Sequence, residues 1–229
     1  CADIVVISVP IDATAAVIAE AGPHVRADGL LMDVTSVKEA PVAAMLRATQ
    51  ASVVGTHPMF GPTTQTLSGQ RVVVCAGRGD HWYAWVRQMY ASRGLLVTEA
   101  TTIQHDRAMA VVQVLNHFQK QVLGLTLARA GVPLAETLSF TSPAYLLEAY
   151  VTARHFAQSA DLYGPIEMLN ARTRDVTSVF RAAAAELESI VLGGKREAFR
   201  AVFEEVRAYF GSFTEEALVQ SKSIIDRVA

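Results

Sequence analysis

One histidine stands in an unusually stiff segment, Thr-His-Pro-Met-Phe-Gly-Pro at residues 56–62, directly after the apolar run at residues 51–54. An imidazole titrates near neutral pH, so it can accept a proton as a general base. Ligands of open α/β sheets bind beyond the carboxyl ends of the strands, which is where we expect this histidine. His57 is therefore a candidate catalytic base held in a turn, with an ordinary loop histidine as the alternative.

Two further strand ends carry polar side chains. Residues 33–38 bring two hydroxyls and the ammonium group of Lys38 to the start of an expected helix. The free N–H groups of such a helix start suit an anion. Ser36 is a candidate to orient His57 or to bind a substrate hydroxyl, and a simple capping role is the alternative. The segment Ser8-Val9-Pro10, at the end of the first expected strand, allows the same two interpretations.

The second half of the chain offers fewer candidates. Arg154 lies in an apolar helical segment, where a guanidinium needs either a substrate carboxylate or a structural ion pair. His117 also lies on an apolar helix and is either functional or a packed interior histidine. His105 and Asp106 look like half of a metal site, but no further His or Cys lies at ligand spacing. We therefore predict no metal.

Composition narrows the class of protein. The chain has 229 residues, of which 51% are apolar and 18% charged, so it is globular and long enough for one large domain or two small ones. The net charge of -2 predicts neither a nucleic-acid partner nor a membrane-surface partner. No apolar run reaches the roughly 18 residues of a membrane span. With Cys1 and Cys75 as the only cysteines, we expect a reducing compartment, the cytoplasm.

The pattern of apolar residues changes near residues 99–103. Before that point strands alternate with helices, which predicts a Rossmann-like parallel α/β sheet over residues 1–100. Expected strands cover residues 4–9, 30–34, 52–54, 71–75 and 95–98, and expected helices cover residues 13–21 (capped by Asp12), 38–49 and 81–92.

After that point the sequence predicts an all-helical domain over residues 101–229. A helix starting near Thr102 joins the two domains, and further helices are expected over residues 108–129, 134–140, 143–158, 162–169, 172–192 and 195–227. These helices hold more apolar residues than a monomer can bury. We therefore expect a homodimer through the helical domain.

The glycine fingerprint of a dinucleotide site, G-x-G-x-x-G after the first strand, does not occur in this sequence. Gly77-Arg78-Gly79 is the nearest approach, but Trp82 occupies the place of the third glycine. The sequence also opens directly on a strand of buried type. We expect that it starts inside a larger domain whose first strands are missing here; loss of pyrophosphate binding is the alternative.

Taken together, these motifs resemble the prephenate dehydrogenase family, most closely the dehydrogenase half of the bifunctional chorismate mutase/prephenate dehydrogenases. The His-Pro-Met-Phe-Gly-Pro segment at residues 57–62 is the most specific part. The other matching stretches are residues 2–10, 33–38, 99–109, 117–118, 142–145 and 154–158.

The resemblance implies NAD-dependent oxidative decarboxylation of prephenate to 4-hydroxyphenylpyruvate, on the route to tyrosine; NADP remains an alternative cofactor. It implies that His57 deprotonates the ring hydroxyl and that Ser36 holds the histidine and the hydroxyl. Substrate-binding residues carried over in the same way are Arg154, Lys38, His117 and Gln113. Cofactor-binding residues are Ser8, Val9 and Pro10.

Two alternatives stay open. Position 146 is Leu where some relatives carry an arginine, which leaves room for a related substrate such as 4-amino-4-deoxyprephenate. The missing fingerprint also allows a protein of another class on the same scaffold, namely a cofactor-free decarboxylase or aromatase, or a ligand-binding module.

Overall fold

The computed structural model describes residues 2–61 and 63–227. Cys1, and Pro62 of the predicted turn, lie outside the described residues. The chain forms two compact units. The sheet unit comprises Cys1–Val114 and Asp161–Thr173, and the helical unit comprises Leu115–Ala160 and Arg174–Ala229. Residues 101–114 thus pack with the sheet, and the domain boundary at residue 100 stays a prediction about the sequence.

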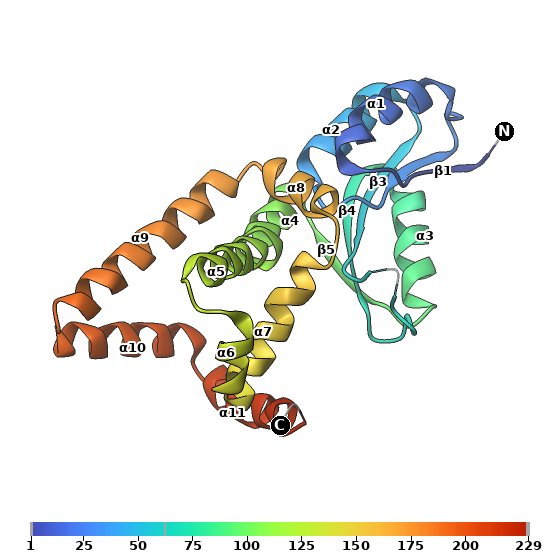
Figure 1. The fold of residues 1–229 in the computed structure, drawn as a ribbon. Helices are drawn as coiled ribbons and strands as arrows, with labels where there is room; N and C mark the ends of the chain where they lie inside the picture. The colour runs from blue at the N-terminus through green and yellow to red at the C-terminus, as the bar shows by residue number, and fades with distance from the viewer. Residues whose placement is uncertain (1, 62, 228–229) are drawn as a thin grey trace. The chain divides into compact units, whose positions relative to one another are not determined.

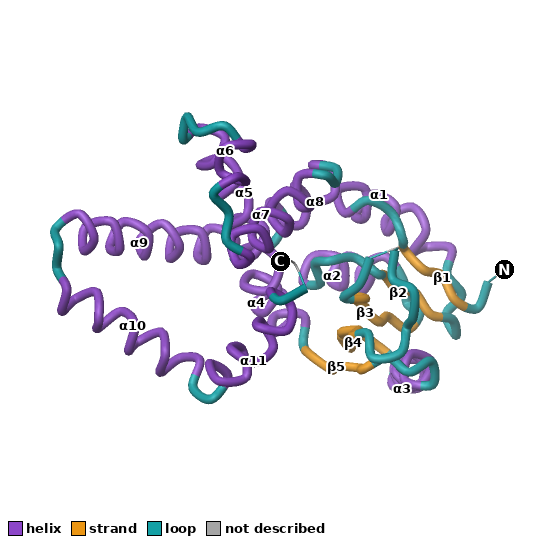
Figure 2. Tube along the Cα trace, turned by 60° about the horizontal axis from the view of Figure 1, so that its bottom comes forward, coloured by secondary structure: helices purple, strands orange, loops and turns teal. Residues whose placement is uncertain are grey.

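A five-stranded sheet forms the centre of the sheet unit, with the strands side by side in chain order (Figure 1 and Figure 2). The strands are β1 (Ile4–Ile7), β2 (Leu30–Asp33), β3 (Ser52–Pro58), β4 (Arg71–Arg78) and β5 (Leu96–Ala100). β1, β2 and β3 are parallel, as are β4 and β5, which confirms the Rossmann-like class. The expectation of a wholly parallel sheet was wrong for one pair, because β3 and β4 run antiparallel. Among the described residues between these two strands, 59–61 and 63–70, there is no helix, and the chain returns beside β3 in the opposite direction.

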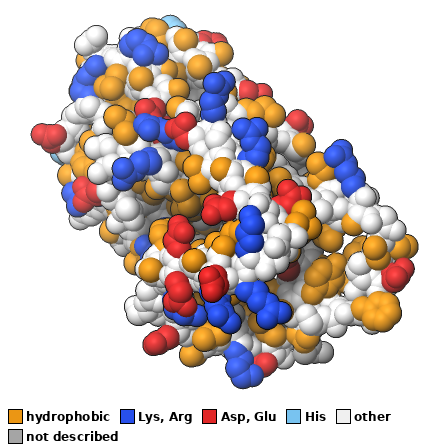
Figure 3. Space-filling model, turned by 90° about the vertical axis from the view of Figure 1, so that its left-hand side faces the viewer, with side chains coloured by type: hydrophobic (Ala, Val, Ile, Leu, Met, Phe, Trp, Pro, Cys, Tyr) orange, Lys and Arg blue, Asp and Glu red, His pale blue; other side chains and the backbone are white. Residues whose placement is uncertain are grey.

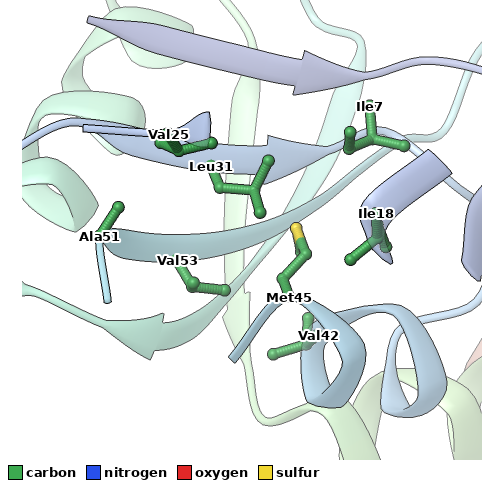
Figure 4. Packing of buried hydrophobic residues seen from close by; sticks show 8 residues of the cluster. All are labelled: Ile7, Ile18, Val25, Leu31, Val42, Met45, Ala51 and Val53. Carbon is green, nitrogen blue, oxygen red and sulfur yellow. The ribbon is translucent and has the colours of Figure 1, made fainter. Parts of the chain in front are cut away.

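Helices cover both faces of this sheet. Side chains alternate between faces along a strand, so Leu31 and Val53 point to one face while Leu30 and Val54 point to the other. The first face packs against α1 (Ile11–Ala21) and α2 (Glu39–Ala48), as Figure 4 shows. The second packs against α3 (Asp80–Ala91) through Val86. Burial on both faces explains the continuous apolar runs of β2 and β4.

Several element limits differ from those expected. β3 continues to Pro58, so His57 lies within a strand and not in the turn after it. β4 continues to Arg78 and takes in part of the predicted glycine turn. Asp12 is not the cap of α1, because the cap position is Pro10 and Asp12 lies in the first turn.

The helix predicted over residues 108–129 is divided into three segments. α4 (Thr102–Met109) is followed by a π-helical segment, η2 (Ala110–Leu115), and then by α5 (Asn116–Arg129). π-helical segments are rare and occur often at functional sites. This one carries Gln113.

Among the described residues, six helices follow α5 in the chain, and one of them, α8, belongs mainly to the sheet unit. Their bounds are α6 (Leu134–Ser139), α7 (Pro143–Phe156), α8 (Ala160–Met168), α9 (Thr173–Leu192), α10 (Arg196–Phe210) and α11 (Phe213–Ile225). The single helix expected over residues 195–227 is broken at Gly211, whose φ of 54° lies in the left-handed region. Among the described residues, no helix combines the length and the apolar character needed to cross a membrane.

Large apolar side chains are exposed along the last three helices. Phe203, Val206 and Phe210 of α10 are each more than two-fifths exposed. Figure 3 faces the side on which α9 and α10 lie in Figure 1, and it shows hydrophobic side chains interspersed with charged ones there. No residue of α10 is buried, although its sequence is strongly amphipathic.

Candidate active site

The candidate base, His57, is held rigidly in the sheet. It lies in β3 opposite Val73 of β4, and only 3% of its surface is exposed. Backbone pairing with β4 and burial together fix the position of the ring. The stiffness expected from the flanking prolines therefore comes mainly from the sheet.

Two residues that sequence reasoning set aside are the partners of His57. Nδ1 of His57 lies 2.9 Å from Nε2 of His105, and Nδ1 of His105 lies 2.7 Å from Oδ1 of Asp106. All three side chains are buried. By its residue types, the pair His105-Asp106 suggests only half of a metal site. The sequence does carry one sign of their role: both residues lie close to the expected start of a helix near Thr102. A helix start fixes the directions of the side chains in its first turns.

The start of α4 is well defined. Thr101 and Gln104 form a capping box: Thr101 Oγ1 accepts from the Gln104 N–H at 3.1 Å, and Gln104 Oε1 accepts from the Thr101 N–H at 2.9 Å. His105 and Asp106 follow in the first and second turns. The capping box therefore sets the direction in which these two residues leave the helix.

Asp106 in turn joins α4 to α2. Its Oδ1 accepts from the backbone N–H of Lys38 at 2.8 Å, and its Oδ2 accepts from the N–H of Glu39 at 2.9 Å. A carboxylate at a helix N-terminus is stabilised by the free N–H groups and the helix dipole. The Asn170 side chain also donates to the backbone carbonyl of Asp106 at 2.9 Å.

Lys38 is fully buried and binds protein groups. Its ammonium donates to Asp33 Oδ2 and, at 2.7 Å, to the carbonyl oxygen of Thr56, the residue before His57. The Thr56 hydroxyl donates to the backbone oxygen of Asp33 at 2.6 Å. These contacts use two of the three N–H donors of the ammonium group and tie Lys38 to the strand that carries His57.

Gln113 approaches His57 from the π-helical segment. Its Nε2 lies 3.4 Å from Nε2 of His57. Among the described residues, no hydrogen-bond partner reaches the buried Oε1 of Gln113. Because a buried unsatisfied acceptor is costly, this atom is suited to accept a hydrogen bond from a ligand.

Burial dominates the electrostatics of the site. Burial lowers the pKa of His57 to about 3, and the neighbouring His105 and Lys38 side chains disfavour a second positive charge there. Burial also lowers the pKa of Lys38 and outweighs its ion pair with Asp33. Burial alone would raise the pKa of Asp106, but hydrogen bonds from His105 and the N–H groups of Glu39 and Lys38 together lower it. At neutral pH His57 is thus unprotonated and Asp106 is ionised.

The predicted cofactor residues share one cavity of about 820 Å³ at the carboxyl ends of β1 and β2. Ser8, Val9, Pro10 and Ser36 line it, together with the carboxylates of Asp12 and Asp161. Ser36 thus lies with the cofactor candidates, whereas the hydrogen bonds to the His57 ring come from His105 and Gln113.

The remaining two candidates belong to the helical unit. The ring of His117 in α5 lies 5.4 Å from that of His155 in α7, and burial, followed by the charges of His155 and Lys120, lowers the pKa of His117 to about 4. Arg154 is exposed on α7. Across the described ranges, no group of three or more His, Cys, Asp or Glu residues is arranged to hold a metal ion.

Comparison with family models matches nearly the whole chain. Residues 1–98 match the nucleotide-binding domain of prephenate dehydrogenase, and residues 101–205 match the dimerization domain of prephenate dehydrogenase. The two matches meet where the sequence changes from α/β to helical.

Individual proteins agree with these matches. The chain is 34% identical to the T-protein of Haemophilus influenzae over 99% of its own length and 60% of the relative's length. It is 26% identical to the 4-amino-4-deoxyprephenate dehydrogenase of Streptomyces pristinaespiralis, over 94% of this chain and 73% of that one. A similar solved structure is prephenate dehydrogenase from Aquifex aeolicus in complex with hydroxyphenyl propionate and NAD+ (TM-score 0.75, 19% identity, covering 90% of this chain and 75% of that chain). The chain thus spans about three-fifths of the length of the T-protein.

Proposed function

This chain belongs to the prephenate dehydrogenase family, and we propose that it carries out the NAD-dependent oxidative decarboxylation of prephenate or a close analogue. The observation that carries this proposal is the buried, unprotonated His57, fixed in β3 by hydrogen bonds and facing Gln113 with Nε2. Such a group suits one task, the removal of one proton from a correctly placed donor.

In the proposed reaction, Nε2 of His57 accepts the proton of the ring hydroxyl. Loss of this proton drives hydride from the ring carbon that bears the hydroxyl. Departure of the ring carboxylate as CO₂ then makes the ring aromatic. NAD, when bound, supplies the hydride acceptor. The chain's own residues bind the substrate, orient it and hold the proton.

The cavity at the ends of β1 and β2 fits part of a dinucleotide. Its volume and its position beyond parallel strands are typical of nucleotide sites. Two carboxylates, Asp12 and Asp161, suit a cationic nicotinamide ring or ribose hydroxyls better than a pyrophosphate. Ser8, Val9, Pro10 and Ser36 would line the bound group.

Arg154 and His117 are the proposed contacts to substrate in the helical unit. Arg154 is an exposed guanidinium on α7, available to pair with a carboxylate. The neutral His117 would line the substrate pocket. For Lys38 we propose an indirect role, since its ammonium is buried and donates to Asp33 and Thr56.

The substrate itself is the finer part of the proposal. Prephenate is our first choice, and the 26% identity to a 4-amino-4-deoxyprephenate dehydrogenase favours that analogue as the second. Position 146 is Leu where some relatives carry an arginine, which supports keeping both compounds as candidate substrates. The ratio of kcat/KM on the two compounds decides between them, and a strong preference for prephenate would exclude the analogue.

We also propose a homodimer formed through the helical unit, in the cytoplasm. The match to a dimerization domain and the exposed apolar stripe of α10 support the dimer. The reducing compartment is inferred from the cysteine content.

The test of the proposed base is His57→Asn. Reduction of NAD with prephenate should fall by about 10²–10⁴-fold in kcat, because the general base is lost while binding contacts remain. Circular dichroism and the melting curve of the variant check that the fold is kept. A folded variant with unchanged kcat would remove His57 from the mechanism.

The alternative from another class is a cofactor-free decarboxylase, aromatase or ligand-binding module. The match of residues 1–98 to the nucleotide-binding domain of prephenate dehydrogenase argues against it. Such a protein would bind or convert prephenate with no dependence on NAD, which the same assay without cofactor detects.

A further inference from the structure

We propose that His105 and Asp106 are positioning residues that fix the tautomer of His57 and then take over its second proton, so that the positive charge formed in the reaction resides on His105. This inference rests on the proposed function and extends it. It assigns a role to a residue pair that the proposed chemistry has not used.

With both histidines neutral, the hydrogen-bond order allows one proton arrangement. Asp106 is an ionised acceptor, so Nδ1 of His105 carries the hydrogen in their 2.7 Å contact. Nε2 of neutral His105 is then an acceptor, and Nδ1 of His57 must donate to it across 2.9 Å. Nε2 of neutral His57 is left unprotonated, on the side where Gln113 lies.

A carboxylate therefore sets, through one imidazole, which nitrogen of another imidazole is the base. Without this chain of contacts, His57 could carry its hydrogen on Nε2 and would face the substrate with a donor. The anchor is firm, because Asp106 also accepts from the N–H groups of Lys38 and Glu39.

The same chain offers a better place for positive charge than His57 itself. The buried ring of His57 is in hydrogen-bond contact with His105 and Gln113, neither of which is an anion. His105, in contrast, touches the Asp106 carboxylate directly. In a buried site an imidazolium is favoured beside a carboxylate, so the charge moves one ring away.

The proton balance is simple. Nε2 of His57 gains the hydroxyl proton, and Nδ1 of His57 passes its own hydrogen to Nε2 of His105. His105 then carries hydrogens on both nitrogens beside ionised Asp106, and His57 is neutral again. Reversal of both transfers returns a proton to the phenolate product.

Lys38 contacts both ends of this chain of hydrogen bonds. Its backbone N–H binds Asp106, while its ammonium binds the carbonyl of Thr56 next to His57. Other ionisable groups near the chain are Asp33, Cys75 and Tyr90, from β2, β4 and α3; of these, Cys75 and Tyr90 have a raised pKa, chiefly because of burial, and stay neutral.

The variant His105→Gln separates a relay from simple packing. The Gln carbonyl can still accept from Nδ1 of His57, but it cannot take up a proton. We expect kcat for prephenate oxidation to fall by roughly ten- to a hundredfold with KM nearly unchanged. The matched control is His81→Gln, the same substitution at an exposed histidine of α3, which should keep both constants. A folded His105→Gln enzyme with kcat within about twofold of wild type would overturn the relay.

Long-range ¹H–¹⁵N spectra of the wild-type protein test the tautomer without any variant. At pH 7 we expect both histidines to carry hydrogen on Nδ1 only. Hydrogen on Nε2 of His57 would overturn the inference. This readout does not need turnover, so a protein that fails to oxidise prephenate yet shows the expected tautomers would contradict the proposed function and leave the hydrogen-bond chain in place.

Discussion

At the scale of single residues, the site depends on groups that the fold keeps away from water. His57 is neutral because the sheet buries it, and its pKa of about 3 links catalysis to stability. A histidine with a lowered pKa in the folded state contributes stability that is fully present above the unfolded value of 6.5. That contribution is lost as the pH falls from 6.5 toward 3.

This linkage predicts the pH dependence of a variant. Between pH 7 and pH 4.5, the free energy of unfolding of His57→Asn should fall less than that of wild type, by about 2 to 3 kcal/mol. Urea unfolding at the two pH values measures the difference. His81→Asn, at an exposed position, is the control and should behave as wild type. An identical pH dependence in wild type and His57→Asn would contradict the lowered pKa.

The buried pair of Lys38 and Asp33 makes a second residue-scale prediction. Lys38→Met leaves Asp33 as a buried carboxylate without its cation, which should cost about 3 to 5 kcal/mol of unfolding free energy. The double variant Asp33→Asn/Lys38→Met should recover much of that loss, because no lone charge remains. Chemical denaturation of the three proteins checks this, and an equally unstable double variant would argue against the ion pair as the cause.

At the scale of elements, the sequence predicted kinds of structure better than their limits. The continuous apolar runs of β1 and β2 and the alternation with helices identified the sheet. Burial on both faces explains this pattern for β2, whereas Val6 of β1 is 48% exposed. The antiparallel return of β4 has no such signature, because both kinds of pairing accept the same residues. The extension of β3 to Pro58 was hidden by the proline, which here ends the strand.

The site was predictable to a similar degree. His57 could be predicted because the segment around it, residues 57–62, is the most specific part of the family resemblance. Gln113 was predicted from the same resemblance. The roles of His105 and Asp106 could not be predicted from their spacing in the sequence. They depend on tertiary contacts of α4, which brings His105 to His57 of β3 and Asp106 to the start of α2. Lys38 was assigned to an anion site because burial of an ammonium cannot be recognised in a sequence.

The close approach of α1 and α2 gives an element-scale prediction. A Cβ on Gly22 would lie 2.4 Å from the Cβ of Ala48, and the backbone of Gly22 is in the right-handed helical region that any residue can adopt. Gly22→Ala should therefore destabilise by about 1 to 3 kcal/mol through overpacking. Ala48→Gly should relieve part of the clash, so the double variant should lose less than the sum of the two single losses. Thermal unfolding of the four proteins gives the coupling energy, and strict additivity would contradict the close packing.

At the scale of the whole molecule, the helical unit is expected to need a second copy. Phe199, Phe203, Val206 and Phe210 recur on one side of α10, and all are exposed. Sedimentation at micromolar concentration should report a dimer. Phe203→Asp should shift the mass toward the monomer, whereas Thr214→Asp on α11 is a polar control that should not. A wild-type monomer at that concentration would contradict the dimer proposal.

The central claim is that this chain's proton-accepting site serves an oxidation. The most direct test is the product balance of the natively expressed protein with prephenate and NAD+, followed by absorbance of reduced cofactor and by chromatography of the aromatic product. The account predicts one reduced cofactor for each 4-hydroxyphenylpyruvate formed. Aromatic product formed without reduced cofactor, or no consumption of prephenate, would contradict it.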